Sequence, residues 1–216
     1  MNNTEKILLK IKTFKSLPFG KTAINCVFSN QKYQLVLVTK DCVNNKNIVR
    51  LLAKWRKFHQ SWFQAQFKVT IKGTKIWLEK KVIDTPDRLL FLIKVNNNLI
   101  GHIGLFRFNF DNYSCEIDNV VRGELGYPGI IQNGLKYLMN WGRKNLFIKN
   151  YTLETTSDNQ KALGLYTKLG FSEFKRIPLI KVNTNGYNEW IEAPNGYENE
   201  IKRYNVFMKI KNSLNI

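Results

Sequence analysis

The sequence predicts a mixed α/β fold in which helices flank a mostly antiparallel central sheet of about six or seven strands. Consecutive β-rich segments fill the middle of the chain, and segments with helical spacing of apolar residues alternate with strands after them. A hydrophobic content of 44% in 216 residues is ample for one buried core. The predicted strands are residues 33–39, 88–95, 99–108, 113–121, 151–156, 171–176 and 204–210.

The beginning of the chain, residues 1–32, is predicted as an extension that precedes a main domain at residues 33–216. Residues 6–14 alternate in polarity enough to form a strand. A Pro-Phe-Gly turn follows at residues 18–20, after which residues 22–28 can return. We therefore expect an N-terminal hairpin.

Two helices are predicted before the central strands, at residues 47–58 and 74–82. Asp41 or Asn45 is placed to cap the first of them. The apolar stripe of that helix consists of Ile48, Leu51, Leu52, Trp55 and Phe58.

The charge of the protein predicts anionic partners. The formal net charge is +18, which attracts nucleic acid, anionic membranes or phosphorylated small molecules. The basic residues are scattered over every predicted element, and no nucleic-acid-binding motif occurs, so we expect neither nucleic acid nor membrane as a partner.

The cysteines and the N-terminus indicate a cytoplasmic protein. Cys26, Cys42 and Cys115 are odd in number and lack a CxxC or histidine partner, so we expect no disulfide framework and no metal site. The first residues contain no signal-length apolar run, and no stretch approaches a membrane span.

A helix near residue 160 contains the first motif that suggests a chemical function. Asn159 is followed by Ala162 three residues later and by Tyr166 seven residues later, and Gly170-Phe171 ends the segment as a C-cap and the next strand should. The preceding strand is residues 151–156, so Asn159 is expected at the mouth between strand and helix.

A glycine-rich loop, residues 122–129, supplies the second motif. It contains Arg122, Gly126 and Gly129 and leads into an amphipathic helix that starts near Ile130. Helix N-termini present unpaired backbone N–H groups, and glycines let a diphosphate approach the backbone closely. The loop is therefore a candidate phosphate site.

The two motifs together resemble the GNAT acetyltransferase superfamily, over roughly residues 33–210. In that family the asparagine and tyrosine of the last helix face coenzyme A, and the glycine loop holds its pyrophosphate. The resemblance implies a GNAT fold and an N-acetyltransferase that uses acetyl-CoA and no metal. It places these residues at the coenzyme: Val120, Val121, Arg122, Gly126, Tyr127, Gly129, Ile130 and Asn159.

The same resemblance assigns Tyr166 as the acid that reprotonates the leaving thiolate. Its unperturbed phenol is protonated at neutral pH. Glu116 is the first candidate for the base that deprotonates the amine, because it lies where many GNAT enzymes place a glutamate. His102 and Asp118 are the alternatives; Asp118 shares the strand face of Glu116, and His102 has a suitable intrinsic pKa.

The acceptor side is predicted from a long segment near residues 177–200, an insertion before the closing strand. Tyr187 and Trp190 on it, together with Arg88, are candidate substrate contacts. A narrower resemblance, in residues 86–88, 101–104 and 116–129, is to GNAT enzymes that N-acetylate amino-deoxysugars linked to nucleoside diphosphates.

We therefore expect an acetyltransferase for a nucleotide-linked amino sugar, acting as a monomer or homodimer. One alternative within the fold is a peptide, a protein or another small amine as acceptor. An alternative of another class is a basic nucleic-acid-binding module, which the net charge alone favours.

Overall fold

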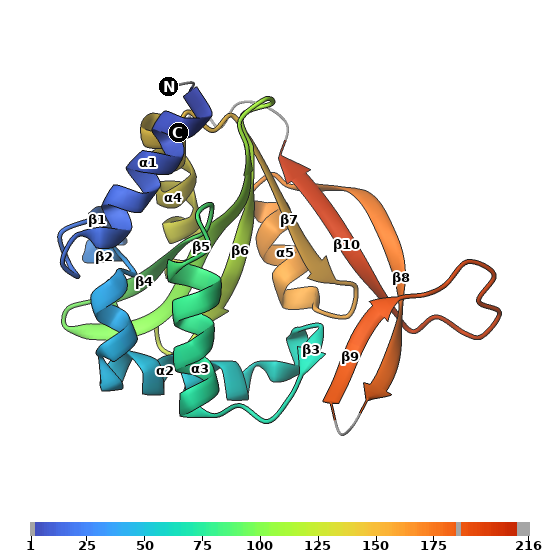
Figure 1. Cartoon of the computed structure of the whole chain (residues 1–216). Helices are drawn as coiled ribbons and strands as arrows, with labels where there is room; N and C mark the ends of the chain where they lie inside the picture. Colours follow the sequence, from blue (N-terminus) through green and yellow to red (C-terminus); the bar gives the residue numbers. More distant parts are fainter. Residues whose placement is uncertain (1–2, 185–186, 211–216) are drawn as a thin grey trace.

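The computed structural model describes residues 3–184 and 187–210. Its described strands form one ten-stranded mixed sheet in the order β1-β2-β4-β5-β6-β7-β10-β8-β9-β3 (Figure 1). The strands are β1 (Ala23–Phe28), β2 (Gln31–Leu37), β3 (Ala65–Gln66), β4 (Leu89–Val95), β5 (Asn98–Asn109), β6 (Ser114–Arg122), β7 (Asn150–Thr156), β8 (Ser172–Thr184), β9 (Tyr187–Glu192) and β10 (Arg203–Ile210).

Helices cover both faces of this sheet. They are α1 (Asn3–Ser16), α2 (Lys46–Phe58), α3 (Ile71–Trp77), α4 (Ile130–Leu146) and α5 (Gln160–Lys168), with short helical turns at Lys40–Asn44 and Gln60–Trp62 and a π-helical continuation of α3 at Leu78–Ile83. Asn45 caps α2 by accepting hydrogen bonds from Asn47 and Ile48, and Asn159 caps α5 through the backbone N–H of Ala162.

Strand β4 shows how the two faces are divided, because it is buried on both. Leu89, Phe91 and Ile93 belong to a large core with α1, α4 and α5. Leu90 and Leu92 point the other way, into a second core under α2 and α3. Alternate side chains of a strand point to opposite faces, so the sheet is the middle layer of three.

The expected N-terminal hairpin is wrong. Residues 6–14 lie inside α1, where Ile7 and Ile11 are buried four residues apart on one helical face. The strand expected at 22–28 does form as β1, but it pairs with β2 instead. The boundary placed at residue 32 stays a prediction.

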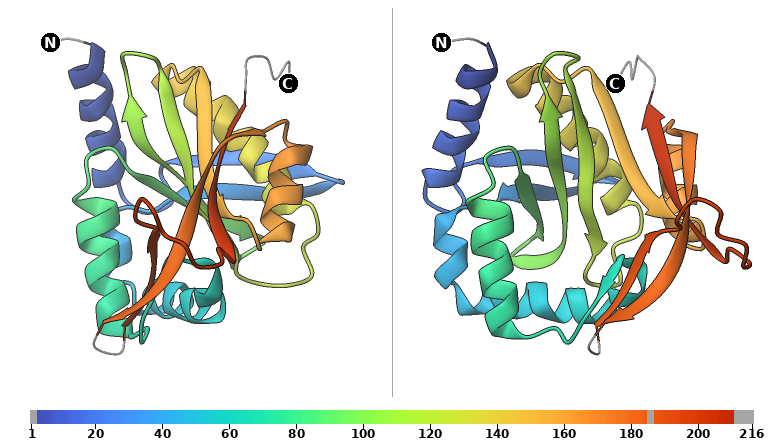
Figure 2. Two further views of the ribbon diagram at one scale, coloured as in Figure 1. Left: turned by 90° about the vertical axis from the view of Figure 1, so that its right-hand side faces the viewer. Right: turned by 45° about the vertical axis from the view of Figure 1, so that its right-hand side comes forward.

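The C-terminal insertion forms a hairpin that extends the sheet beyond the expected six or seven strands. Strand β8 runs on to Thr184 and is followed by β9, which pairs with β3 from the connection between α2 and α3. Figure 2 shows α2 running below the central strands toward β3, beside β9. None of the described helices is long and apolar enough to cross a membrane.

Candidate active site

The site is built where two parallel strands part. Strands β6 and β7 are paired only from Ser114 to Ile117. Beyond that point β7 pairs with β10 only, and β6 continues along β5 to Arg122. Asn119 has a left-handed φ of 51°, and the register between β5 and β6 shifts nearby. The bulged backbone turns β6 away from β7 and opens the sheet.

A cavity of about 1490 Å³ occupies this opening. Its walls come from α2, from residues 59–70 that connect α2 to α3, from the ends of β6 and β7, from the glycine loop and from α5. We call residues 59–70 the strap. The strap is tied across the cavity through β3, and the backbone N–H of Trp190 also donates to the carbonyl of Gln64 at 2.9 Å.

One end of the cavity is formed by the glycine loop and α5. Gly126 and Gly129 have φ values of 90° and 80°, a region that glycine adopts without strain, and α4 begins directly after them. A Cβ atom at Gly129 would lie 2.5 Å from the ring of Phe28, which would have to shift to admit it. The start of α4 presents unpaired backbone N–H groups, as helix N-termini do, and these can receive an anionic group.

Most of the residues predicted to bind the cofactor lie at this end. The cavity is lined by Val120, Val121, Arg122, Tyr127, Gly129 and Asn159. Gly126 is not part of the lining. The side chain of Ile130 is buried in the large core, which leaves only its backbone N–H for a ligand.

Tyr166 lies in the cavity wall on α5, as predicted. Its side chain is 6% exposed and packs edge-on against Phe171, and its hydroxyl makes no hydrogen bond to any described residue. Burial, together with the charge of Asp118, raises the pKa of the phenol well above its usual value. Tyr166 is thus a protonated hydroxyl that is free to donate to a ligand.

Glu116 lies on β6 at the parting of the strands. Burial, reinforced by the nearby carboxylate of Glu154, raises its pKa to about 7, although the guanidinium of Arg107 opposes the shift. A carboxyl with a pKa near neutral can accept a proton and release it again at physiological pH. Glu116 thus combines a cavity position with a pKa suited to a base.

His102 and Asp118 also line the cavity, but neither is suited to be the base. Burial lowers the pKa of His102 to about 4, and its Nδ1 is 2.7 Å from the backbone carbonyl oxygen of Asn119. The carboxylate of Asp118 lies 2.9 Å from Nε of Arg88 and accepts a hydrogen bond from the Asn119 amide. These groups hold one another in place.

The acceptor wall differs from the one predicted. Tyr187 and Trp190 do not line the cavity: Tyr187 stacks on Phe67 of the strap, and Trp190 lies beneath the guanidinium of Arg203. The strap supplies the wall instead, through Phe63 and Phe67. Of the predicted acceptor contacts only Arg88 lines the cavity.

Sequence reasoning also missed several other lining side chains, among them Trp77, Glu154 and Asn205. Trp77 lies on the predicted second helix, but its spacing is that of an ordinary core residue. Glu154 was visible as a carboxylate two residues from the end of a β-rich strand. No local pattern marks Asn205.

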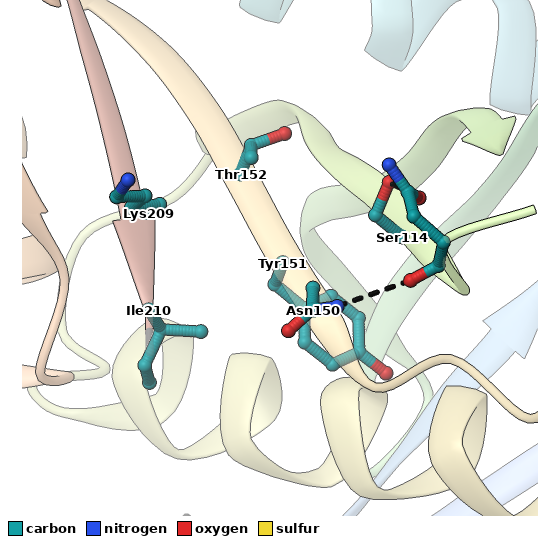
Figure 3. A pocket seen from close by; sticks show the side chains of 7 residues that line it. Ser114, Asn150, Tyr151, Thr152, Lys209 and Ile210 are labelled. Carbon is teal, nitrogen blue, oxygen red and sulfur yellow. Dashed lines mark hydrogen bonds between the residues drawn. The ribbon is translucent and has the colours of Figure 1, made fainter. Parts of the chain in front are cut away.

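A second, smaller hollow of about 370 Å³ lies elsewhere, between Ser114, Asn150, Thr152 and Lys209 (Figure 3). Asn150 donates a hydrogen bond to the carbonyl of Asn112 there. The hollow brings no acid and base together. No group of three or more His, Cys, Asp or Glu side chains that could hold a metal ion occurs in the part of the chain that the structure covers.

A sheet whose parallel strands part, a glycine loop before α4 and a buried tyrosine on α5 are the arrangement expected of the GNAT family. The model of the acetyltransferase (GNAT) family matches residues 52–171, more than half of the chain. The protein belongs to this family.

Curated relatives and solved structures agree with this assignment. The chain is 23% identical to the spermidine N(1)-acetyltransferase of Escherichia coli over 51% of its own length and 59% of that protein, and 28% identical to an N-acetyltransferase 9-like protein of Caenorhabditis briggsae over 47% and 61%. The chain thus spans about three fifths of these relatives.

Two solved structures share the fold. Spermidine N-acetyltransferase from Vibrio cholerae, in complex with coenzyme A and spermine, gives a TM-score of 0.61 at 18% identity, covering 82% of this chain and 94% of that one. The RimL ribosomal alpha-N-protein acetyltransferase gives 0.61 at 14% identity, covering 90% and 98%.

Proposed function

We propose that this protein transfers an acetyl group from acetyl-CoA to a primary amine of a small cationic molecule of the polyamine type. The observation on which the proposal rests is the group of carboxylates at the acceptor end of the cavity. Glu116, Asp118 and Glu154 line it, and Glu116 has a pKa near 7. A protonated amine is attracted to this group and can lose its proton there.

The cavity also fits the cofactor. Acetyl-CoA supplies an activated acetyl thioester. The N-terminus of α4 and the positive-φ glycine at position 129 leave room for a diphosphate, and Arg122 and Lys161 add positive charge along the same wall. Asn159 at the start of α5 borders this wall.

Each protein group then has a separate role. Glu116 takes the proton from the acceptor ammonium, which makes its nitrogen nucleophilic. A backbone N–H of Val120 or Val121, on the turned-out end of β6, donates to the developing oxyanion. Tyr166, kept protonated by burial, donates its proton to the departing sulfur.

The strap favours a slender acceptor over a folded protein. It lines the cavity with Phe63 and Phe67 and is joined by backbone hydrogen bonds to β9, so the acceptor end is bounded on both sides. Aromatic faces attract ammonium groups and tolerate aliphatic carbons. The likeness to spermidine acetyltransferases supports a polyamine.

The other acceptors have less support. The RimL relative acts on a ribosomal protein, and at 14% identity that likeness concerns the fold alone. The nucleotide-linked amino sugar was suggested by a resemblance in residues 86–88, 101–104 and 116–129, with Tyr187, Trp190 and Arg88 as the expected contacts. Tyr187 and Trp190 lie outside the cavity, and Arg88 is paired with Asp118. The nucleic-acid-binding module is favoured by the net charge alone, and membership of an acetyltransferase family does not support it.

The compartment and the assembly stay proposals. The cytoplasm suits three cysteines that are free and buried. A spermidine acetyltransferase of Vibrio cholerae is described as a dodecamer, which adds higher homo-oligomers to the monomer or homodimer that we expected.

The proposal is tested by measuring thiol release from acetyl-CoA with three acceptor panels: polyamines, peptides with free N-termini, and amino-sugar nucleotides. We expect kcat/KM for spermidine or spermine to exceed that for the other panels by at least about tenfold. Peptides or amino-sugar nucleotides as the best acceptors would contradict the polyamine assignment. No release with any acceptor would contradict the enzyme assignment.

A further inference from the structure

Arg107 bridges two of the cavity carboxylates from outside the cavity. Its Nη1 atom lies 2.9 Å from Oε2 of Glu116 and 2.9 Å from Oε1 of Glu154. Its side chain is 60% exposed, whereas those of Glu116 and Glu154 are 16% and 26% exposed. Arg107 is not among the cavity-lining residues, so it holds the two carboxylates from the solvent side.

Three strands contribute to this contact, and each side chain is held in place. Arg107 lies on β5 at a register irregularity and has a left-handed φ of 50°, a conformation that non-glycine residues seldom adopt. The second oxygen of Glu154 accepts a hydrogen bond of 2.8 Å from Asn205, whose side chain is buried. The bridge is thus a built arrangement rather than a chance surface pair.

The charges around the pair determine what it can bind. Glu116 and Glu154 contribute two negative charges when ionised, and Arg107 supplies one positive charge. The neighbouring Asp118 has its own partner in Arg88, and the nearby Tyr166 is neutral. When both carboxylates are ionised, the pair and Arg107 together carry one uncompensated negative charge. A single ammonium group of an acceptor can neutralise it.

We propose that Arg107 is the specificity-determining residue of this site: by occupying one side of the Glu116–Glu154 pair, it limits the pair to one ammonium group of the acceptor. The proposal rests on the proposed function. Without Arg107 both carboxylates can each pair with an ammonium group of the acceptor. The affinity for short diamines should therefore rise relative to that for monoamines of the same length.

The same contact makes Arg107 a positioning residue for the base. Its positive charge favours the ionised form of Glu116, in opposition to burial, Glu154 and Asp118. Replacing Arg107 with a neutral side chain therefore raises the pKa of Glu116 further. The acid limb of the pH profile, where kcat/KM falls as Glu116 becomes protonated, should then move to higher pH.

The test compares Arg107→Gln, Arg107→Lys and the control Arg176→Gln. Arg176 is an exposed arginine paired with Glu173, and neither residue lines the cavity. For each protein, kcat/KM is measured across pH with propylamine and with 1,3-diaminopropane. In Arg107→Gln we expect the acid limb to move to higher pH by about one unit. We also expect the ratio of kcat/KM for 1,3-diaminopropane to that for propylamine, the diamine preference, to rise about tenfold because KM for the diamine falls.

Arg107→Lys keeps the charge and is expected to restore both the limb and the preference toward the wild-type values. Arg176→Gln is expected to match the wild type. An unchanged limb and an unchanged diamine preference in Arg107→Gln would overturn the proposal, and so would equal effects of Arg107→Gln and Arg176→Gln.

A measurement without turnover separates this proposal from the proposed function. The carboxyl carbon of Glu116 is titrated by carbon-13 NMR in the wild type, in Arg107→Gln and in Glu154→Gln, and binding of 1,3-diaminopropane is measured by calorimetry. The Glu116 titration should move to higher pH in Arg107→Gln, which removes a neighbouring positive charge, and to lower pH in Glu154→Gln, which removes a neighbouring negative charge.

These opposite shifts can be read even if no amine is acetylated, in which case the proposed function fails and the role of Arg107 is still decided. If Arg107→Gln does not fold cooperatively, the same titration and the 1,3-diaminopropane affinity of Arg107→Met decide it. A Glu116 titration and a diamine affinity that both stay in place when the arginine is replaced by a neutral side chain would overturn the proposal.

Discussion

Nδ1 of His102 lies 2.7 Å from the backbone carbonyl oxygen of Asn119, next to the point where β6 leaves β7. A carbonyl can only accept, so the imidazole carries its proton on Nδ1 and donates it. The buried ring thereby holds Asn119, the residue with a left-handed φ of 51° at which β6 turns away from β7. His102 thus shapes the opening of the sheet, and our proposed function assigns to Glu116 the proton transfer that the residue type of His102 suggested.

Replacing His102 with glutamine should leave the acid limb of the kcat/KM profile near pH 7, because a group with a pKa of about 4 cannot produce that limb. The limb is measured from the pH dependence of kcat/KM with spermidine. Disappearance of the limb in His102→Gln would assign the base to His102 instead.

His102 should also make the wild type sensitive to acid. Its folded-state pKa lies below the usual value of 6.5, so its stabilising contribution is complete above about pH 6.5 and is lost as the pH falls toward 4. The loss is about 3 kcal/mol at most. Urea unfolding at several pH values should show a smaller loss in His102→Gln than in the wild type. Equal slopes in both proteins would refute this account.

Glu116→Gln should lower kcat by about a hundredfold or more and abolish the acid limb, because the amine then has no base. Stopped-flow or steady-state assays with spermidine measure both effects. The variant Glu173→Gln, outside the cavity, is the control and should behave as the wild type does. A Glu116→Gln enzyme with a normal rate would remove Glu116 from the mechanism.

The same residue should reduce stability at neutral pH. The pKa of Glu116 rises from 4.5 to about 7 on folding, so folding favours its protonated form. Wild-type stability should therefore decline as the pH rises from about 4.5 to 7, by about 3 kcal/mol at most. Glu116→Gln should lack this decline, which urea titrations at pH values of about 5 and 8 can measure. A parallel decline in the variant would contradict the prediction.

Tyr166→Phe should lower kcat by about ten- to a hundredfold and leave the Kd of coenzyme A nearly unchanged, since the variant keeps the ring and loses only the unpaired hydroxyl. Steady-state kinetics and calorimetry with coenzyme A measure the two quantities. An unaltered kcat would show that another group protonates the thiolate.

Two glycines of the phosphate loop form a matched pair. Both have positive φ, but a Cβ atom at Gly126 meets nothing within 4 Å, whereas one at Gly129 would lie 2.5 Å from Phe28. Gly126→Ala should cost about 1 kcal/mol of unfolding free energy from backbone strain. Gly129→Ala should cost more and should also weaken coenzyme A binding.

Chemical denaturation and calorimetry compare these two variants. Adding Phe28→Ala to Gly129→Ala should recover part of the coenzyme A affinity, because it removes the clash and leaves the strain. Equal costs for Gly126→Ala and Gly129→Ala would show that the ring of Phe28 moves aside freely.

Several elements were predictable because short-range rules determine them. The helix from Asn159 to the glycine at position 170 has its cap, its apolar face and its left-handed C-terminal residue within one short segment. Hydrophobic patterning likewise predicts β4, β5 and α2 almost to their ends. The N-terminal segment was mispredicted because polar and apolar residues alternate over residues 6–14. This alternation masked the four-residue spacing of Ile7 and Ile11, which is typical of a helix.

From its sequence alone, the protein could be assigned to the GNAT family, with Asn159, Tyr166, Glu116 and the glycine loop at the site, because these motifs depend on residues close together in the chain. Tertiary structure was needed for the acceptor side. Arg107, Glu116 and Glu154 come from three strands, and the strap reaches the cavity through pairing with β9. Such contacts depend on which strands lie next to one another in the fold and on how deeply each group is buried. Burial raises the pKa of Glu116 to about 7 and lowers that of His102 to about 4, and the sequence does not specify either burial.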